Sequence, residues 1–113
     1  MLLKKADPRE VALALLNRST SAVQVACVLV DKEGRIYSWG WNGMGSTGYG
    51  EHAEQAAVRR ASRARLEGST AYVVARRRKS RGVVTSKPCE TCQRLLGGVY
   101  RVVYRDREGW YEL

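Results

Sequence analysis

Apolar residues recur along the chain at helical spacing in some segments and at strand spacing in others. Asp7 followed by Pro8 is typical of a helix start, and the apolar positions that follow recur at helical spacing, so we expect a helix to about Arg18. Residues 23–31 are apolar on both alternating sets, which predicts a central strand covered on both faces. After a tight turn, residues 36–41 are expected to pair with this strand as a hairpin.

The remaining pattern alternates strands with helices. The glycine-rich residues 42–50 predict a loop, and the alanine stripe within residues 52–66 predicts one helix that lies close to a sheet. Three further segments follow: a strand at 70–76, a helix at 89–96, and a strand at 100–104 that returns through a turn into 110–113. This order predicts an α/β sandwich around one mixed sheet with hairpins at both ends.

Length, charge and cysteine content narrow the possible functions. The chain, residues 1–113, suffices for one domain with a single core. Lys and Arg number 20 against 11 Asp and Glu, and the net charge of +9 favours anionic partners. No apolar run has the length of a membrane span or the form of a signal peptide, so we expect a cytoplasmic protein without membrane contact. Three cysteines cannot all pair within one chain, which indicates reduced thiols, and Cys27 inside an apolar strand is expected in the core.

Two short clusters have the spacing of a metal site. His52 stands two residues before Glu54 at the start of one predicted helix, and Cys89 and Cys92 stand three apart at the start of another. One imidazole and two thiolates suit Zn²⁺ and leave a coordination position for water, which is typical of a catalytic site. The helix dipole at that start should lower the pKa of both thiols. Glu54 is badly placed as a ligand but can reach a metal-bound water as a general acid and base.

The segments HAE at 52–54 and PCETC at 88–92 form H-x-E and P-C-x-x-C, the signature of zinc nucleobase deaminases. With these motifs and this order of elements, the chain resembles the cytidine and deoxycytidylate deaminase superfamily. Residues 40–44, GWNGM, are similar to the G-[YW]-N segment of that family. The resemblance implies a three-layer α/β/α fold with one mixed sheet of about five strands and a C-terminal β-hairpin. It also implies that His52, Cys89 and Cys92 bind Zn²⁺, that Glu54 moves protons and that Asn42 contacts the substrate.

Two departures from the family pattern bear on the branch to which the chain is closest. Ten basic and flexible residues, 77–86, stand between a predicted strand and the P-C-x-x-C motif, where many relatives run on directly. The final strand is expected to return as a hairpin, which resembles the free-cytidine and bacterial toxin branches. His52 argues against the free-cytidine branch, which usually has Cys at that position.

Substrate contacts are expected around the glycine-rich loop and the basic connection. Trp41 and Tyr49, next to Asn42 and Glu51, can stack on a base, whereas Trp39 is expected in the core. Ala53 is a further expected substrate contact. Six basic residues stand in one connection that holds no acid and can act as a phosphate clamp: Arg76, Arg77, Arg78, Lys79, Arg81 and Lys87. Alternatively, this run is a solvated loop.

Together these residues predict zinc-dependent hydrolytic deamination of a nucleobase, with cytosine converted to uracil in single-stranded DNA. The alternatives are a deaminase of a free nucleotide or nucleoside, such as deoxycytidylate or cytidine, and a tRNA adenosine deaminase. A nucleic-acid-binding module without catalysis is a further alternative. Glu54 argues against it, because a structural metal site needs no carboxylate at that position. The sequence predicts no particular oligomeric state.

Overall fold

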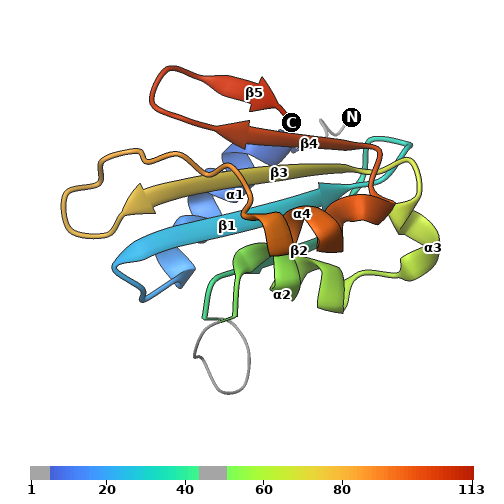
Figure 1. The fold of residues 1–113 in the computed structure, drawn as a ribbon, viewed down its shortest axis with the longest axis horizontal. Helices are drawn as coiled ribbons and strands as arrows, with labels where there is room; N and C mark the ends of the chain where they lie inside the picture. The colour runs from blue at the N-terminus through green and yellow to red at the C-terminus, as the bar shows by residue number, and fades with distance from the viewer. Residues whose placement is uncertain (1–5, 44–50) are drawn as a thin grey trace, which may run out of the picture.

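A computed structural model of the chain describes residues 6–43 and 51–113. One five-stranded sheet runs through it in the order β2-β1-β3-β4-β5 (Figure 1). The strands are β1 (Val23–Val30), β2 (Ile36–Trp41), β3 (Thr70–Arg77), β4 (Arg101–Arg105) and β5 (Trp110–Glu112). Antiparallel pairs join β1 to β2 and β3, and β4 to β5, while β3 and β4 are parallel. The sheet is therefore mixed, with the expected hairpin at each end.

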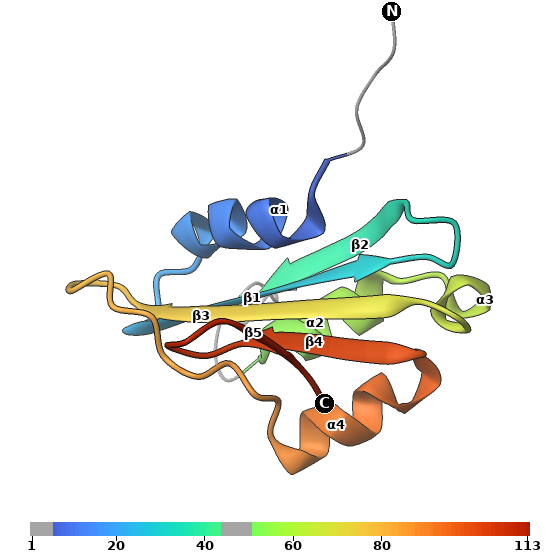
Figure 2. The same cartoon turned by 90° about the horizontal axis from the view of Figure 1, so that it is seen from above.

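Helices cover both faces of the sheet and make three layers (Figure 2). They are α1 (Pro8–Leu15), α2 (Ala53–Arg60), α3 (Arg63–Leu66) and α4 (Glu90–Leu95), with 3-10 turns η1 (Leu16–Arg18) and η2 (Leu96–Gly98). Helix α1 packs on one face, where Ala12 and Leu16 meet Val28 of β1. On the other face, Ala53 and Ala57 of α2 share a cluster with Cys27. Strand β1 is thus covered on both faces, as its apolar pattern predicts, and Cys27 is a core residue.

Gly40 allows α2 to lie directly on the sheet. A Cβ at this position would be 2.6 Å from Cβ of Ala56 and 2.7 Å from the backbone nitrogen of Ala57. The hydroxyl of Ser38 donates to the carbonyl of Ala57 at 2.7 Å, which ties the same helix to β2. These contacts fix the position of α2, which carries the first candidate site residues.

The predicted single helix over residues 52–66 is broken into α2 and α3. At Ala61 the backbone becomes extended, with φ −77° and ψ 146°. The break lets Leu66 pack against the core and lets Arg65 form an ion pair with Asp31 after β1. Tertiary contacts at the far end of the segment therefore outweigh its uniform helix propensity.

Trp39 lies at the surface and not in the core, where it was expected. It is 36% exposed, and the guanidinium of Arg60 lies 4.8 Å from the centre of its ring. The register of β1 and β2 shifts beside Val30, which pairs with Ile36 while Leu29 pairs with Ser38. At this shift Tyr37 pairs with no residue of β1. Its side chain packs against the core cluster between the sheet and α2. The aromatic residues of β2 therefore do not share one face.

In the described part of the chain, every helix is too short or too polar to cross a bilayer.

Candidate metal centre and active-site cavity

Three potential metal ligands meet at the starts of α2 and α4. Nδ1 of His52 lies 3.2 Å from Sγ of Cys92 and 3.8 Å from Sγ of Cys89. All three ligand atoms lie within 4.8 Å of one another. One imidazole nitrogen and two sulfurs form a donor set that suits Zn²⁺ and leaves a fourth coordination position. The residues present therefore fit zinc, with Nδ1 as the histidine ligand atom.

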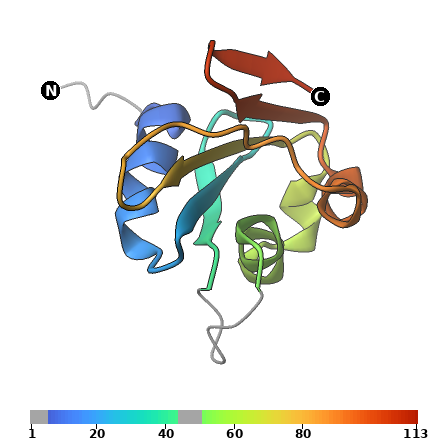
Figure 3. The same cartoon turned by 60° about the vertical axis from the view of Figure 1, so that its left-hand side comes forward.

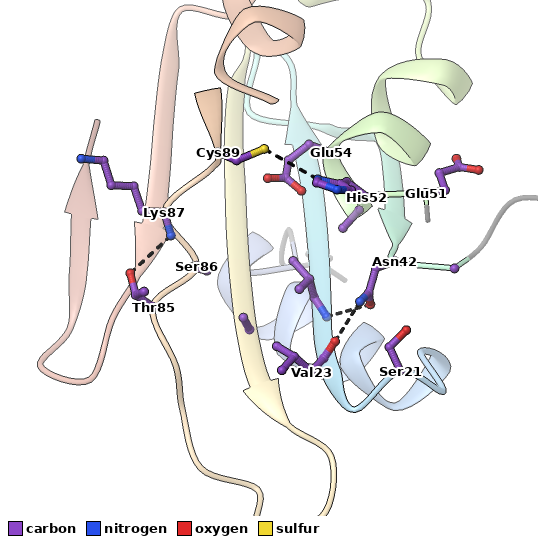
Figure 4. A pocket seen from close by; sticks show the side chains of 14 residues that line it. Ser21, Val23, Asn42, Glu51, His52, Glu54, Thr85, Ser86, Lys87 and Cys89 are labelled. Atoms are coloured by element: carbon purple, nitrogen blue, oxygen red, sulfur yellow. Dashed lines mark hydrogen bonds between the residues drawn. The ribbon is translucent and has the colours of Figure 1, made fainter. Parts of the chain in front are cut away.

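Local hydrogen bonds hold each ligand at its helix start. The backbone N–H of His52 donates to Oε1 of Gln55 at 2.8 Å, in the manner of a capping box. Cys89 caps α4, and its carbonyl accepts the N–H of Gln93 at 2.8 Å. The side chain of Gln93 also donates to the carbonyl of Pro88 at 2.9 Å. Because both helices begin at the same end of the sheet, these short-range bonds bring ligands from distant segments together (Figure 4).

Burial, and not the helix dipole, dominates the acidity of Cys92. Desolvation raises the pKa of this thiol above its ordinary value, and the nearby Glu54 carboxylate raises it further. The expected lowering by the start of α4 is therefore wrong for Cys92, because α4 has only six residues and the sulfur is buried. In the metal-free protein this thiol is protonated at neutral pH, so binding of zinc must release its proton.

Glu54 lies beside the three ligands without belonging to the cluster. Its side chain comes from the first turn of α2, points into the cavity and is 4% exposed (Figure 4). Burial raises the pKa of this carboxyl, while its own backbone N–H and the nearby His52 oppose the change. A buried carboxyl with a raised pKa next to a metal centre is suited to accept and return a proton.

A cavity of about 370 Å³ opens in front of Glu54 and the cluster. Apolar atoms of Val25, Ala53 and Ala75 form part of its wall. The other lining residues are Ser21, Val23, Asn42, Gly43, Glu51, His52, Glu54, Thr85, Ser86, Lys87 and Cys89. Its size and mixed lining suit a small ring compound with a few polar groups.

The charged groups at the mouth of this cavity are not equivalent. Glu51 forms an ion pair with Arg59, whose Nη2 lies 3.0 Å from Oε1. Lys87 is exposed, and in Figure 4 its side chain extends outward from the rim. Among the described residues that line the cavity, Lys87 is the one Lys or Arg. The rim therefore offers a positive charge to the part of a ligand that projects out of the cavity.

The amide of Asn42 faces the cavity but is mostly engaged by the protein. Its Oδ1 accepts from Ser19 Oγ at 2.6 Å and from the N–H of Val25 at 2.9 Å. Its Nδ2 donates to the carbonyl of Val23 at 2.8 Å. One N–H of the amide therefore remains for a ligand, so Asn42 can serve a substrate only as a donor.

A hydrogen-bond network next to Asn42 was not predicted from the sequence. Nε2 of Gln24 donates to the carbonyl of Ser19 at 2.7 Å, and Oε1 of Gln24 accepts from Nε of Arg76 at 3.0 Å. Ser19 and Gln24 are 2% and 3% exposed. A polar glutamine among the apolar residues of a strand is the signal that could have indicated this network.

Ser86 is a second buried polar residue that the sequence analysis does not identify. Its hydroxyl lies 2.7 Å from the carbonyl of Val73 and 2.8 Å from that of Arg105, and it accepts the N–H of Arg105 at 2.9 Å. The hydroxyl thus joins β3 and β4 to the segment that leads into Cys89. This bridge holds the second half of the metal centre against the sheet.

The other predicted substrate-binding residues have different positions. Ala53 lines the cavity. Trp41 does not: it pairs with Ala26, whose side chain belongs to the α1 face, and Arg18 lies 5.8 Å from its ring centre. Tyr49 lies outside the described residues.

The predicted phosphate clamp is divided. Lys87 lies at the cavity, whereas Nη2 of Arg76 donates to Oδ1 of Asn17 at 2.6 Å and Nη1 of Arg81 to the same oxygen at 3.3 Å. Nη1 of Arg78 donates to the carbonyl of Thr20 at 2.7 Å. The two remaining basic residues, Arg77 and Lys79, are exposed. The connection therefore lies against residues 17–22, and its arginines do not enter the cavity.

Comparison with known proteins places the chain in a family and shows a similar solved structure. Residues 5–105 match the family model of the cytidine and deoxycytidylate deaminase zinc-binding region. The fold is similar to the crystal structure of cytidine deaminase from Burkholderia pseudomallei, with a TM-score of 0.68 and 22% sequence identity over 94% of this chain and 88% of that one. At this identity the likeness shows a common fold. No curated protein sequence matches the chain.

Proposed function

The chain belongs to the cytidine and deoxycytidylate deaminase family of zinc-binding enzymes, and we propose that its substrate is cytosine in single-stranded DNA, which it hydrolyses to uracil. The observation that carries the chemistry is the buried carboxyl of Glu54 beside the cluster of His52, Cys89 and Cys92. Zinc held by these three residues would lower the pKa of a bound water towards neutrality.

Glu54 then carries out the proton transfers. Its carboxylate accepts a proton from the attacking water as a C–O bond forms at C4 of the base, and it delivers that proton to ring N3. The same group afterwards transfers the proton of the new C4 hydroxyl to the exocyclic nitrogen, so the C4–N bond breaks, ammonia leaves and the C4 carbonyl of uracil forms. Water and cytosine are consumed, and uracil and ammonia are produced. The apolar wall at Val25 and Ala75 limits the water that can compete for these protons.

Charge supports a phosphate-bearing substrate. Lys87 stands at the rim, where the sugar and phosphate of a bound nucleotide would project from the cavity. The net charge of +9 and the arginine-rich connection after β3 favour a polynucleotide, which offers several phosphates at once. Deoxycytidylate is the second candidate, because Lys87 alone could neutralise its single phosphate group.

The test is incubation of the purified zinc-loaded protein with single-stranded DNA, duplex DNA, RNA, deoxycytidylate and deoxycytidine, with products read by mass spectrometry. We expect the highest rate of uracil formation with single-stranded DNA and a higher rate with deoxycytidylate than with deoxycytidine. Glu54→Gln should retain zinc and lower the rate on the best substrate by about 10²–10⁴-fold, because an amide cannot accept the water proton.

Deoxycytidylate as the best substrate would replace the polynucleotide proposal with the nucleotide one. Near-normal deamination by the Glu54→Gln variant would contradict the assigned role of Glu54, whichever substrate is best.

A further inference from the structure

A second cavity, which we call the basic groove, adjoins the active-site cavity where β1 begins and β3 ends. Its volume is about 470 Å³, and Val23 belongs to the lining of both cavities. Its other lining residues are Thr20, Ala22, Arg77, Arg78, Lys79 and Ser80. Residues 20–23 form one wall of this basic groove and residues 77–80 the other. Figure 3 shows the connection after β3 on the same side of the molecule as α1 and the start of β1.

The basic groove carries positive charge without compensation from its own lining. Three of its described lining residues are Arg or Lys, and none of them is Asp or Glu. Arg77 and Lys79 are exposed, and among residues 6–43 and 51–113 neither side chain has a hydrogen-bond or ion-pair partner. Arg78 uses one N–H for Thr20 and retains the others of its guanidinium. The groove therefore has free donors and charge for an anion.

The groove is held in shape by backbone hydrogen bonds. The N–H of Arg78 donates to the carbonyl of Ala22 at 2.9 Å, which joins the two walls. The N–H groups of Arg77 and Arg81 close the turn by donating to Gly82 and Arg77 carbonyls, both at 2.9 Å. Arg81 has a φ of 64°, a conformation that side chains other than glycine and asparagine seldom adopt. A turn held this way presents its charges in defined positions, unlike a solvated run.

Two further arginines next to the groove, Arg76 and Arg81, form a like-charge pair. The guanidinium groups of Arg76 and Arg81 both donate to the neutral Oδ1 of Asn17. Desolvation and then the charge of Arg81 lower the pKa of Arg76, so the pair is held together against repulsion. Bound anions nearby would relieve this repulsion.

We propose that the basic groove binds the phosphodiester backbone of the strand whose target base occupies the active-site cavity. This inference rests on the proposed function, since it needs a polynucleotide substrate. A strand that leaves the cavity past Val23 meets Arg77, Arg78 and Lys79 directly, so groove and cavity form one continuous track.

The experiment compares two double variants that lose the same charge. Arg77→Gln with Lys79→Gln removes the two free cations of the groove. Lys32→Gln with Arg63→Gln removes two exposed cations near the opposite end of the sheet, where α3 and the turn after β1 lie (Figure 1). Binding of a labelled single-stranded oligonucleotide is measured by fluorescence anisotropy over a range of salt concentrations, after thermal melting has shown that both variants are folded.

We expect the groove variant to flatten the plot of log affinity against log salt by about 1.4, which is about 0.7 for each lost phosphate contact. At physiological salt this corresponds to about tenfold weaker binding, whereas the control should change by less than twofold. Deamination of free deoxycytidylate should be equal in both variants.

Equal affinity and slope in the two variants, while the wild-type protein binds and deaminates the oligonucleotide, would overturn the groove but not the proposed substrate. A wild-type protein that deaminates deoxycytidylate but neither binds nor deaminates the oligonucleotide would overturn both.

Discussion

The orientation of the Asn42 amide follows from its partners. The backbone N–H of Val25 can only donate, so the atom that faces it must be Oδ1. Nδ2 then faces the carbonyl of Val23 and keeps one free N–H. Asn42 should therefore bind an acceptor on the substrate, such as a sugar or phosphate oxygen, and Ser19 should act as its positioning residue through Oγ.

Substitution of Ser19 tests this positioning. Ser19→Ala removes one of the two hydrogen bonds to Oδ1 of Asn42, and we expect KM for the best substrate to rise about fivefold, as the loss of about 1 kcal/mol implies. The value of kcat and the zinc content should stay unchanged, because the hydroxyl touches neither Glu54 nor the metal ligands. The control is Ser62→Ala, since Ser62 makes no side-chain capping bond. An unchanged KM, measured by steady-state kinetics, would show that Asn42 needs no support from Ser19.

The packing of α2 on β2 sets where His52 and Glu54 lie. The helix approaches so closely because Gly40 has no side chain, and the backbone of α2 occupies the space that a Cβ would need. Small residues on α2, Ala53, Ala56 and Ala57, complete this contact and are buried. The position of Glu54 therefore depends on the contact between α2 and β2.

We expect Gly40→Ala to lower the free energy of unfolding by about 1–3 kcal/mol, the usual cost of overpacking a core. The matched control is Gly97→Ala, where a new Cβ meets nothing within 4 Å. Both are measured by urea denaturation of the zinc-loaded protein. Equal stability of the two variants would mean that α2 can shift away from β2 without cost.

Zinc should link the two halves of the molecule on one face of the sheet. His52 comes from the start of α2 and the two cysteines from the start of α4, which lie 37 and 40 residues further along the chain. A metal bound to all three closes this long loop and stabilises the folded state only.

Removal of zinc by a chelator should accordingly lower Tm. At a free zinc concentration one hundred times the Kd, binding contributes about 2.7 kcal/mol, which corresponds to about 10 °C for a domain of this size. Differential scanning calorimetry should show that Tm returns when zinc is added back. The Cys89→Ala variant should show a much smaller shift, and an equal shift in that variant would exclude Cys89 as a ligand.

The candidate metal centre could be predicted from sequence because its signals are local. These signals are the residues that begin α2 and α4, the spacing of His52 and Glu54, and the spacing of Cys89 and Cys92. Each signal spans only a few residues of the sequence. The run of residues that is apolar on both faces likewise predicts the covered strand β1, and the turns between strand segments predict the hairpins at both ends. Caps, turns and periodicity depend on near neighbours, so these features need no knowledge of the rest of the chain.

Contacts between distant segments were decided by the tertiary structure. Arg76 reaches Asn17, 59 residues away, because β1 and β3 pair in a register that sets Gln24 opposite Arg76. That register turns most of the predicted phosphate clamp away from the cavity and builds the groove beside it. The break at Ala61 depends in the same way on where Leu66 finds the core. A strand register and a packing contact are properties of two segments at once, and no pattern within either segment specifies them.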